Sequence, residues 1–78
     1  SNPVTNKTLK LNFENLPAGK YVVNIFDRTG RKILTTSLDY QGGILSKSIS
    51  LEKTSAKGIC YLSVNGNSFN KKIRLLIE

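Results

Sequence analysis

A chain of 78 residues is long enough for one small domain, and it contains one cysteine and no histidine. This composition excludes an internal disulfide and, in practice, a zinc cluster, and it leaves no histidine to act as a base near neutral pH. The 12 Lys and Arg against 5 Asp and Glu give a net charge of +7, which favours acidic partners such as nucleic acid, anionic lipid or a phosphorylated glycan. The lysines are spread along the chain, however, so the charge also fits simple solvation of the outer faces of strands.

The small size makes the hydrophobic core marginal. A domain of this length buries only about 60% of the surface of its unfolded chain. Without a disulfide or a metal, such a domain usually needs a larger host protein. The sequence has no apolar run long enough to span a bilayer, no signal-peptide pattern and no initiator Met. We therefore expect a fragment of a larger protein whose N-terminal neighbour is missing.

The chain begins with a polar segment. Residues 1–7 predict a linker or a first edge strand around Val4, and residues 8–78 are expected to form the domain. Residues 8–13 alternate between apolar and polar side chains, which is typical of a half-buried strand. Its apolar face is made of Leu9, Leu11 and Phe13.

The clearest strand pattern lies in residues 19–30. Every second side chain is apolar over residues 20–26, which predicts a strand with two distinct faces. Residues 27–30 end this strand as a turn, and a return strand is predicted over residues 31–38. One face of the first strand is made of Tyr21, Val23 and Ile25.

The middle of the chain contains a second turn signal. Residues 39–43 predict a turn or short loop, because Gly42-Gly43 tolerates positive φ and breaks regular structure. Residues 44–51 alternate again and predict a strand, although Lys47 interrupts the apolar face.

The last third of the chain predicts a hairpin. A strand over residues 58–64 is followed by a turn at 65–67 and a last strand over 69–77, and Asn-Gly between two strand patterns is a strong hairpin signal. In the last strand the two faces are Ile73, Leu75 and Ile77 on one side and Lys72, Arg74 and Leu76 on the other.

Six or seven short strands with regular turns and no helical period predict an all-β fold, an antiparallel β-sandwich. Residues 19–25 and 58–64 share a Gly, a nearby Tyr and alternating aliphatic residues. This similarity fits two explanations: the two strands occupy equivalent places in the two sheets, or they resemble each other by chance.

The sequence shows no catalytic, cofactor-binding or metal-binding group, so we expect a protein that is not an enzyme and holds no cofactor. Asp27 and Asp39 are both predicted in turns, where Asp more often bonds its own backbone than transfers protons. Cys60 lies in an apolar strand without a base partner, which predicts a small buried hydrophobic side chain.

Aromatic residues near lysines raise the question of nucleic-acid binding, since single-strand binders place aromatic side chains on a basic sheet face. Tyr21 and Phe69 share faces with aliphatic residues, which favours the core and argues against nucleic acid as a partner. Phe26 falls on the opposite face from Tyr21, which leaves its exposure open. The basic C-terminal run follows a hairpin signal, so we interpret it as a strand and expect no stable membrane insertion.

Several short motifs follow one another along nearly the whole chain. They are Asn2-Pro3, Leu16-Pro17-Ala18-Gly19-Lys20-Tyr21-Val22-Val23, Ile25-Phe26-Asp27-Arg28-Thr29-Gly30-Arg31-Lys32-Ile33, Lys57-Gly58-Ile59, Tyr61-Leu62 and Lys71-Lys72-Ile73. Each is weak alone, but in this order and spacing the sequence resembles the type A C-terminal sorting domain of cargo proteins exported by the type IX (Por) secretion system of Bacteroidetes.

The resemblance implies an immunoglobulin-like β-sandwich of about seven strands at the C-terminus of a larger secreted cargo protein. Such a domain is a signal: the cargo enters the periplasm by the Sec route and is directed across the outer membrane, to be secreted or held at the cell surface. The implied partners are the type IX outer-membrane translocon and a sortase-like peptidase that removes the domain. Only Asn2-Pro3 represents the family's usual Tyr-Pro-Asn-Pro lead-in, so we expect the processing site upstream.

The resemblance also marks positions in this chain. It places recognition in the last strand, at Lys71, Lys72, Ile73 and Arg74. Family members often have Tyr where this chain has Cys60, and Tyr61 follows one residue later, so which of the two faces the core stays open. The positions marked as fold-defining are Pro17, Gly19, Tyr21, Val23, Ile25, Asp27, Gly30, Gly58 and Tyr61.

Two other functions fit a small sandwich attached to a secreted protein. A carbohydrate- or matrix-binding accessory module would need an exposed aromatic platform, for which Tyr40 and Phe26 are the candidates. A structural spacer in an adhesin would need no recognition surface. The sequence leaves the cargo and its activity open.

Overall fold

The computed structural model describes residues 4–78, so the Asn2-Pro3 motif lies outside the described residues. The described residues form six strands and no helix, which confirms the all-β prediction, and each strand begins and ends within two residues of its predicted bounds. The strands are β1 (Thr8–Glu14), β2 (Gly19–Asp27), β3 (Lys32–Tyr40), β4 (Ile44–Ser50), β5 (Gly58–Asn65) and β6 (Asn70–Ile77).

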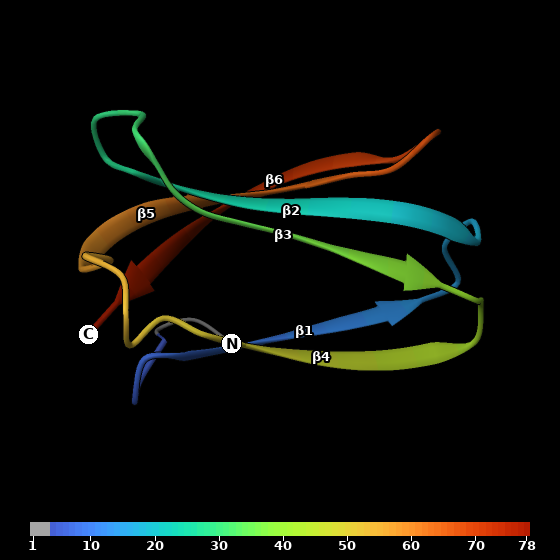
Figure 1. Ribbon diagram of the computed structural model, residues 1–78, viewed down its shortest axis with the longest axis horizontal. Coiled ribbons are helices and arrows are strands. Elements are labelled where there is room, and N and C mark those ends of the chain that lie inside the picture. Colours follow the sequence, from blue (N-terminus) through green and yellow to red (C-terminus); the bar gives the residue numbers. More distant parts are fainter. Residues whose placement is uncertain (1–3) are drawn as a thin grey trace.

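Two antiparallel sheets face each other (Figure 1). The larger sheet has four strands in the order β3-β2-β5-β6, and the smaller one pairs β1 with β4. The two layers of the sandwich are therefore unequal in width, because a sheet of two strands faces a sheet of four. The immunoglobulin-like detail, with about seven strands, stays a prediction.

Of the two explanations for the similar strands, equivalent places in the two sheets is wrong. β2 and β5 are neighbours in the same sheet, with Ile25 opposite Leu62, and do not hold matching places in the two sheets. Both are central strands whose alternate residues face one core, and that shared environment is enough to give them similar sequences.

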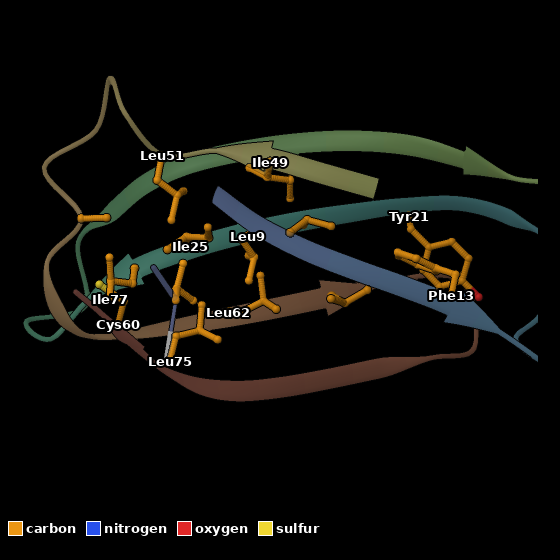
Figure 2. Close-up of a cluster of buried hydrophobic side chains, with 14 of the residues drawn as sticks. Leu9, Phe13, Tyr21, Ile25, Ile49, Leu51, Cys60, Leu62, Leu75 and Ile77 are labelled. Carbon is orange, nitrogen blue, oxygen red and sulfur yellow. The ribbon is translucent and has the colours of Figure 1, made fainter. Parts of the chain in front are cut away.

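The core between the sheets has an aromatic end and an aliphatic end (Figure 2). At the aromatic end, the ring centroid of Tyr21 lies 5.4 Å from Phe13, 6.0 Å from Tyr40 and 6.1 Å from Phe69. These separations are typical of stabilising edge-on aromatic pairs. The aliphatic end contains Leu9, Ile25, Leu51, Cys60, Leu62, Leu75 and Ile77.

The position of Tyr40 corrects the turn predicted over residues 39–43. β3 continues through Asp39 and Tyr40, which pair with Lys20 and Gly19 of β2. Tyr40 is 1% exposed, and its hydroxyl donates a hydrogen bond to the carbonyl of Gly43. Burial of the ring at the aromatic end of the core outweighs the local turn signal, so the turn begins only after Tyr40.

Val4, at the start of the described chain, pairs with the C-terminal end of β6. Val4 is fully buried and forms a parallel bridge with Ile77. The N–H of Val4 donates to the carbonyl of Leu76 at 2.7 Å, and the N–H of Glu78 donates to the carbonyl of Val4 at 2.9 Å. Val4 therefore covers the outer edge of β6 near its C-terminal end.

Candidate recognition surface

β6 is the last strand of the larger sheet, and it pairs with β5 along its whole length. Leu75 and Ile77 point into the core, as the predicted alternation requires. Residues 71–74 therefore lie together on one strand but are divided between two faces of the sheet. Ile73 follows the inward register of Leu75, whereas Lys72 and Arg74 lie on the outer face and are exposed.

The inward side of this segment opens into a groove between the sheets. Ile73 is only half-buried, because β1 and β4 together are too narrow to cover all four strands of the other sheet. The groove has a volume of about 340 Å³ and carries Lys71 at its rim. It is lined by Leu11, Asn12, Phe13, Glu14, Leu16, Val64, Phe69, Lys71 and Ile73.

The outer face of the larger sheet is built in rows that cross the strands. In one row Phe26 of β2 lies opposite Tyr61 of β5, and Tyr61 lies opposite Arg74 of β6. The next row has Asn24, Ser63 and Lys72 in the same three strands. Side chains directly opposite each other in an antiparallel pair lie close enough to touch, so each row forms one continuous strip of surface.

Two hollows open on this outer face, and Lys72 lines both. One has a volume of about 410 Å³ and is lined by Phe26, Gly30, Tyr61 and Lys72. Gly30 takes part because the β2–β3 turn curls away from the smaller sheet, as seen at the upper left of Figure 1. The other hollow has about 190 Å³ and is lined by Ser63, Asn65, Asn70, Lys71 and Lys72.

The row beside Phe26 and Tyr61 is polar and partly buried. Ser63 is 7% exposed although it lies on the outer face, and its Oγ accepts a hydrogen bond from Asn65 Nδ2 at 3.4 Å. Asn24 Oδ1 is buried and accepts no hydrogen bond from the described residues. A buried acceptor without a donor costs free energy of folding.

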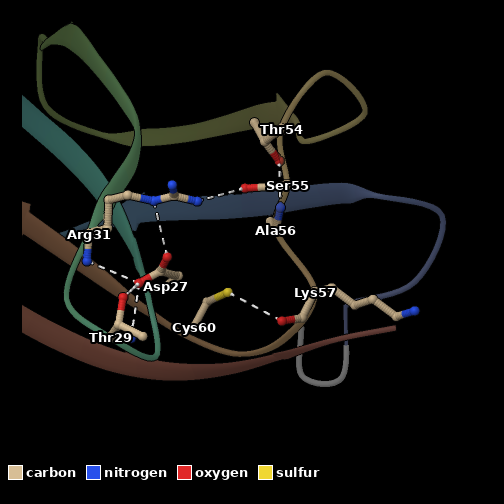
Figure 3. A network of polar contacts seen from close by, with 8 residues as sticks. All are labelled: Asp27, Thr29, Arg31, Thr54, Ser55, Ala56, Lys57 and Cys60. Carbon is tan, nitrogen blue, oxygen red and sulfur yellow. Dashed lines mark hydrogen bonds and ion pairs between the residues drawn. The ribbon is translucent and has the colours of Figure 1, made fainter.

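The turn after β2 is organised by one carboxylate (Figure 3). Asp27 Oδ1 accepts hydrogen bonds from Thr29 Oγ1 at 2.6 Å, from Thr29 N at 2.9 Å and from Arg31 N at 3.0 Å. Asp27 Oδ2 lies 3.3 Å from Arg31 Nε. The hydrogen bond from the Thr29 hydroxyl, followed by that from the Arg31 backbone, lowers the pKa of Asp27. The prediction that Asp27 bonds its own turn is confirmed, whereas Asp39 lies in β3 and not in a turn.

The structure decides the question left open at Cys60 and Tyr61. Cys60 is fully buried in the core, as predicted, and its thiol faces the carbonyl of Lys57 (Figure 3). Tyr61 points outward and is 37% exposed. The predicted glycan platform of Tyr40 and Phe26 is wrong, because Tyr40 lies in the core and Phe26 lies on the opposite face of the sheet.

The fold-defining positions play different structural roles. Tyr21, Val23 and Ile25 form the buried face of β2, and the Tyr21 hydroxyl donates to the carbonyl of Pro17 at 2.6 Å. Gly30 and Gly58 have φ of 93° and 72°, a region that disfavours any side chain. Gly19 begins β2, and Tyr61 contributes to the outer face of the sheet.

The cross-strand pairing of Phe26 with Tyr61 is the feature of this surface that sequence reasoning missed. Alternation alone places both side chains on the faces opposite to Tyr21 and Cys60. Their adjacency depends on the register between β2 and β5, which are separated by β3, β4 and two changes of sheet. No local pattern in the sequence encodes that register.

Other kinds of site find no support in the part of the chain that is described. No three His, Cys, Asp or Glu side chains within residues 4–78 gather where they could hold a metal ion. These residues also include no helix that is long and apolar enough to cross a membrane.

Comparison with known proteins gives one match. Residues 2–78 match the family described as the secretion system C-terminal sorting domain. No curated protein and no solved structure matches the chain.

Proposed function

The chain belongs to the family of secretion system C-terminal sorting domains, and on that premise we propose that its last strand, β6, is the element that the type IX secretion machinery recognises. Membership makes the domain a sorting signal for type IX secretion, carried by a larger cargo protein that is exported to the cell surface or secreted.

The observation that carries the proposal is the position of β6 at the end of the larger sheet, with basic side chains exposed. The recognition residues are Lys71, Lys72, Ile73 and Arg74. A terminal strand offers a partner both backbone groups along its edge and side chains on its two faces. Lysine and arginine in these positions favour an acidic partner.

The remaining steps of the proposed function follow the family resemblance. The cargo crosses the inner membrane by the Sec route, and the translocon then carries it across the outer membrane. A sortase-like peptidase removes the domain at a site upstream of residue 1, and the domain itself performs no chemistry. The bridge and hydrogen bonds that hold Val4 against the end of the chain support a cleavage site before the domain. A cut within residues 4–78 would disrupt the fold and would not release an intact domain.

The proposal is tested by fusing residues 1–78 behind a secreted reporter in a host with a working type IX system. We expect the reporter at the cell surface or in the medium, and retention in the periplasm would contradict the sorting function. Deleting residues 71–78 is a poor test of recognition, because it also removes Leu75 and Ile77 from the core.

A sharper test reverses the charge of exposed lysines on β6 and leaves the buried side chains unchanged. The double variant Lys71→Glu/Lys72→Glu should lower export at least tenfold. The matched control Lys10→Glu/Lys53→Glu changes the net charge equally at exposed positions far from β6. Thermal unfolding of the purified chains shows whether both variants are folded. Equal export of the two double variants would contradict recognition through β6.

A further inference from the structure

The outer face of the larger sheet carries an unusual share of the exposed apolar surface. Within residues 4–78, five large hydrophobic side chains are exposed: Val22, Ile44, Ile59, Tyr61 and Leu76. All except Ile44 lie on this face, because their strand neighbours are the buried residues of the core. Apolar side chains gathered on one side of a small protein mark an interaction surface more often than scattered ones do.

The centre of this face is aromatic. Phe26 and Tyr61 are cross-strand partners, and the hollow of about 410 Å³ lies over them, with Gly30 and Lys72 completing its lining. Ile59 and Leu76 form the next cross-strand pair and extend the apolar surface toward the end of β6. An aromatic centre continued by aliphatic side chains is the composition of the buried part of a protein interface.

Basic residues flank this apolar centre on both sides. Arg74 lies opposite Tyr61 on β6, and Lys32 lies opposite Phe26 on β3. Lys72 lies in the neighbouring row, opposite Ser63. The rows that contain Phe26 and Asn24 hold no carboxylate among the described residues. Asp27 lies in the next row, opposite Cys60, and Asp39 lies at the far end of β3, opposite Lys20.

We infer that this outer face, centred on Phe26 and Tyr61 and flanked by Lys72, docks onto an acidic protein surface of the secretion machinery. The inference rests on the proposed function and names the part of the domain that meets the partner. Recognition would then involve not β6 alone but a surface formed by β2, β5 and β6 together. A protein partner fits better than a glycan or nucleic acid, because Val22, Ile59 and Leu76 offer branched aliphatic surface instead of further flat rings for stacking.

The first test uses two single variants in the reporter fusion, Tyr61→Thr and Lys72→Glu. Threonine is β-branched and therefore suits a strand, and both positions are exposed, so both chains are expected to fold. Export should fall at least tenfold for Lys72→Glu and at least threefold for Tyr61→Thr. The control Lys10→Glu, which lies in the smaller sheet, should stay within twofold of the unaltered fusion.

The outcomes separate this inference from the proposed function. If the unaltered fusion is not exported, the sorting function itself fails. If Lys71→Glu blocks export while Tyr61→Thr and Lys72→Glu do not, recognition through β6 stands and docking through the outer face is overturned. If Tyr61→Thr and Lys72→Glu lose export while Lys71→Glu does not, the result supports docking through the outer face.

The class of partner is tested by placing a photoactivatable cross-linking residue at position 61, with position 10 as the control, in cells that export the fusion. We expect a cross-linked product from position 61 whose peptides come from a component of the secretion machinery, and we expect Lys72→Glu to abolish it. An adduct to glycan or nucleic acid, or no adduct at position 61 in exporting cells, would overturn the inferred protein partner.

Discussion

Gly66 lies against the ring of Tyr21, where a Cβ atom would stand only 2.6 Å from Cε2 of the tyrosine. The sequence predicts a hairpin turn over residues 65–67, and an Asn-Gly pair in such a turn usually takes positive φ. The hairpin between β5 and β6 is confirmed, but its loop runs over residues 66–69, closed by Gly66 N donating to the carbonyl of Phe69 at 2.7 Å. Gly66 has no left-handed φ, so the glycine is required for space beside the ring.

Gly66→Ala should therefore destabilise the domain, because either the loop or the Tyr21 ring has to move. We expect a loss of about 1–3 kcal/mol in the free energy of unfolding, as for other overpacked sites. Urea unfolding measures it as a lower midpoint at an unchanged slope. Ser68→Ala in the same loop is the control and should change stability by less than about 0.5 kcal/mol. Equal midpoints for the two variants would show that the ring yields without cost.

Tyr40 should behave as a core residue. Tyr40→Ala removes a fully buried ring and should cost about 3–5 kcal/mol. Tyr40→Phe removes only the hydroxyl that donates to Gly43 and should cost about 1 kcal/mol. Thermal unfolding followed by circular dichroism checks both values. A stable Tyr40→Ala chain that loses binding to a glycan would instead restore the platform that the structure excludes.

The turn carboxylate predicts a dependence of stability on pH. Hydrogen bonds from Thr29 and Arg31 hold the pKa of Asp27 below its ordinary value of 3.8. The ionised Asp27 carboxylate therefore stabilises the fold fully when the pH is above its unfolded-state pKa. This stabilisation is lost as the pH falls through the lower pKa of the folded state. The stability difference between the unaltered chain and Asp27→Asn should shrink between pH 5 and pH 2, measured by urea unfolding at each pH. A difference that does not change with pH would contradict this role. Glu52→Gln, an exposed position in a connecting loop, is the control.

Cys60 should be protected from thiol reagents while the domain is folded. Its side chain is fully buried, so labelling has to wait for an opening of the structure. For a marginally stable domain we expect labelling to be at least about a thousandfold slower in buffer than in concentrated urea. Lys53→Cys in a Cys60→Ala background supplies an exposed thiol as the control. Rapid labelling of Cys60 in the folded chain would show that β5 opens locally.

Val4 should count as part of the folded domain, although the sequence suggests a boundary at residue 8. Removing residues 1–4 deletes a buried side chain and two backbone hydrogen bonds, one to Leu76 of β6 and one from Glu78. We expect a loss of about 1.5–3 kcal/mol in stability from the buried valine alone. Hydrogen exchange should also become faster at the amide of Glu78, which donates to Val4. Thr5→Ala is the matched control, and unchanged exchange at Glu78 after the truncation would contradict the bridge.

The sequence by itself determined the strands and the faces that they bury. Alternation in β1, β2 and β6 is a local property, and a strand buries every second residue wherever its neighbours come from. The same reasoning correctly assigned Cys60 to the core and Asp27 to its own turn. The ordered motifs also identified the family, which the match over residues 2–78 confirmed.

Only the tertiary structure decided which residues from distant parts of the chain lie next to each other. The Gly-Gly signal after Tyr40 is local and strong, but the ring is buried by Phe13 and Tyr21, which come from distant parts of the chain. The closeness of Tyr21 to Gly66 and the cross-strand pairing of Phe26 with Tyr61 depend on strand order and register. These are set when the whole core closes, since a shift of one residue would turn every buried side chain of a strand outward. The surface proposed for docking is for that reason a property of the assembled sheet and not of any one segment.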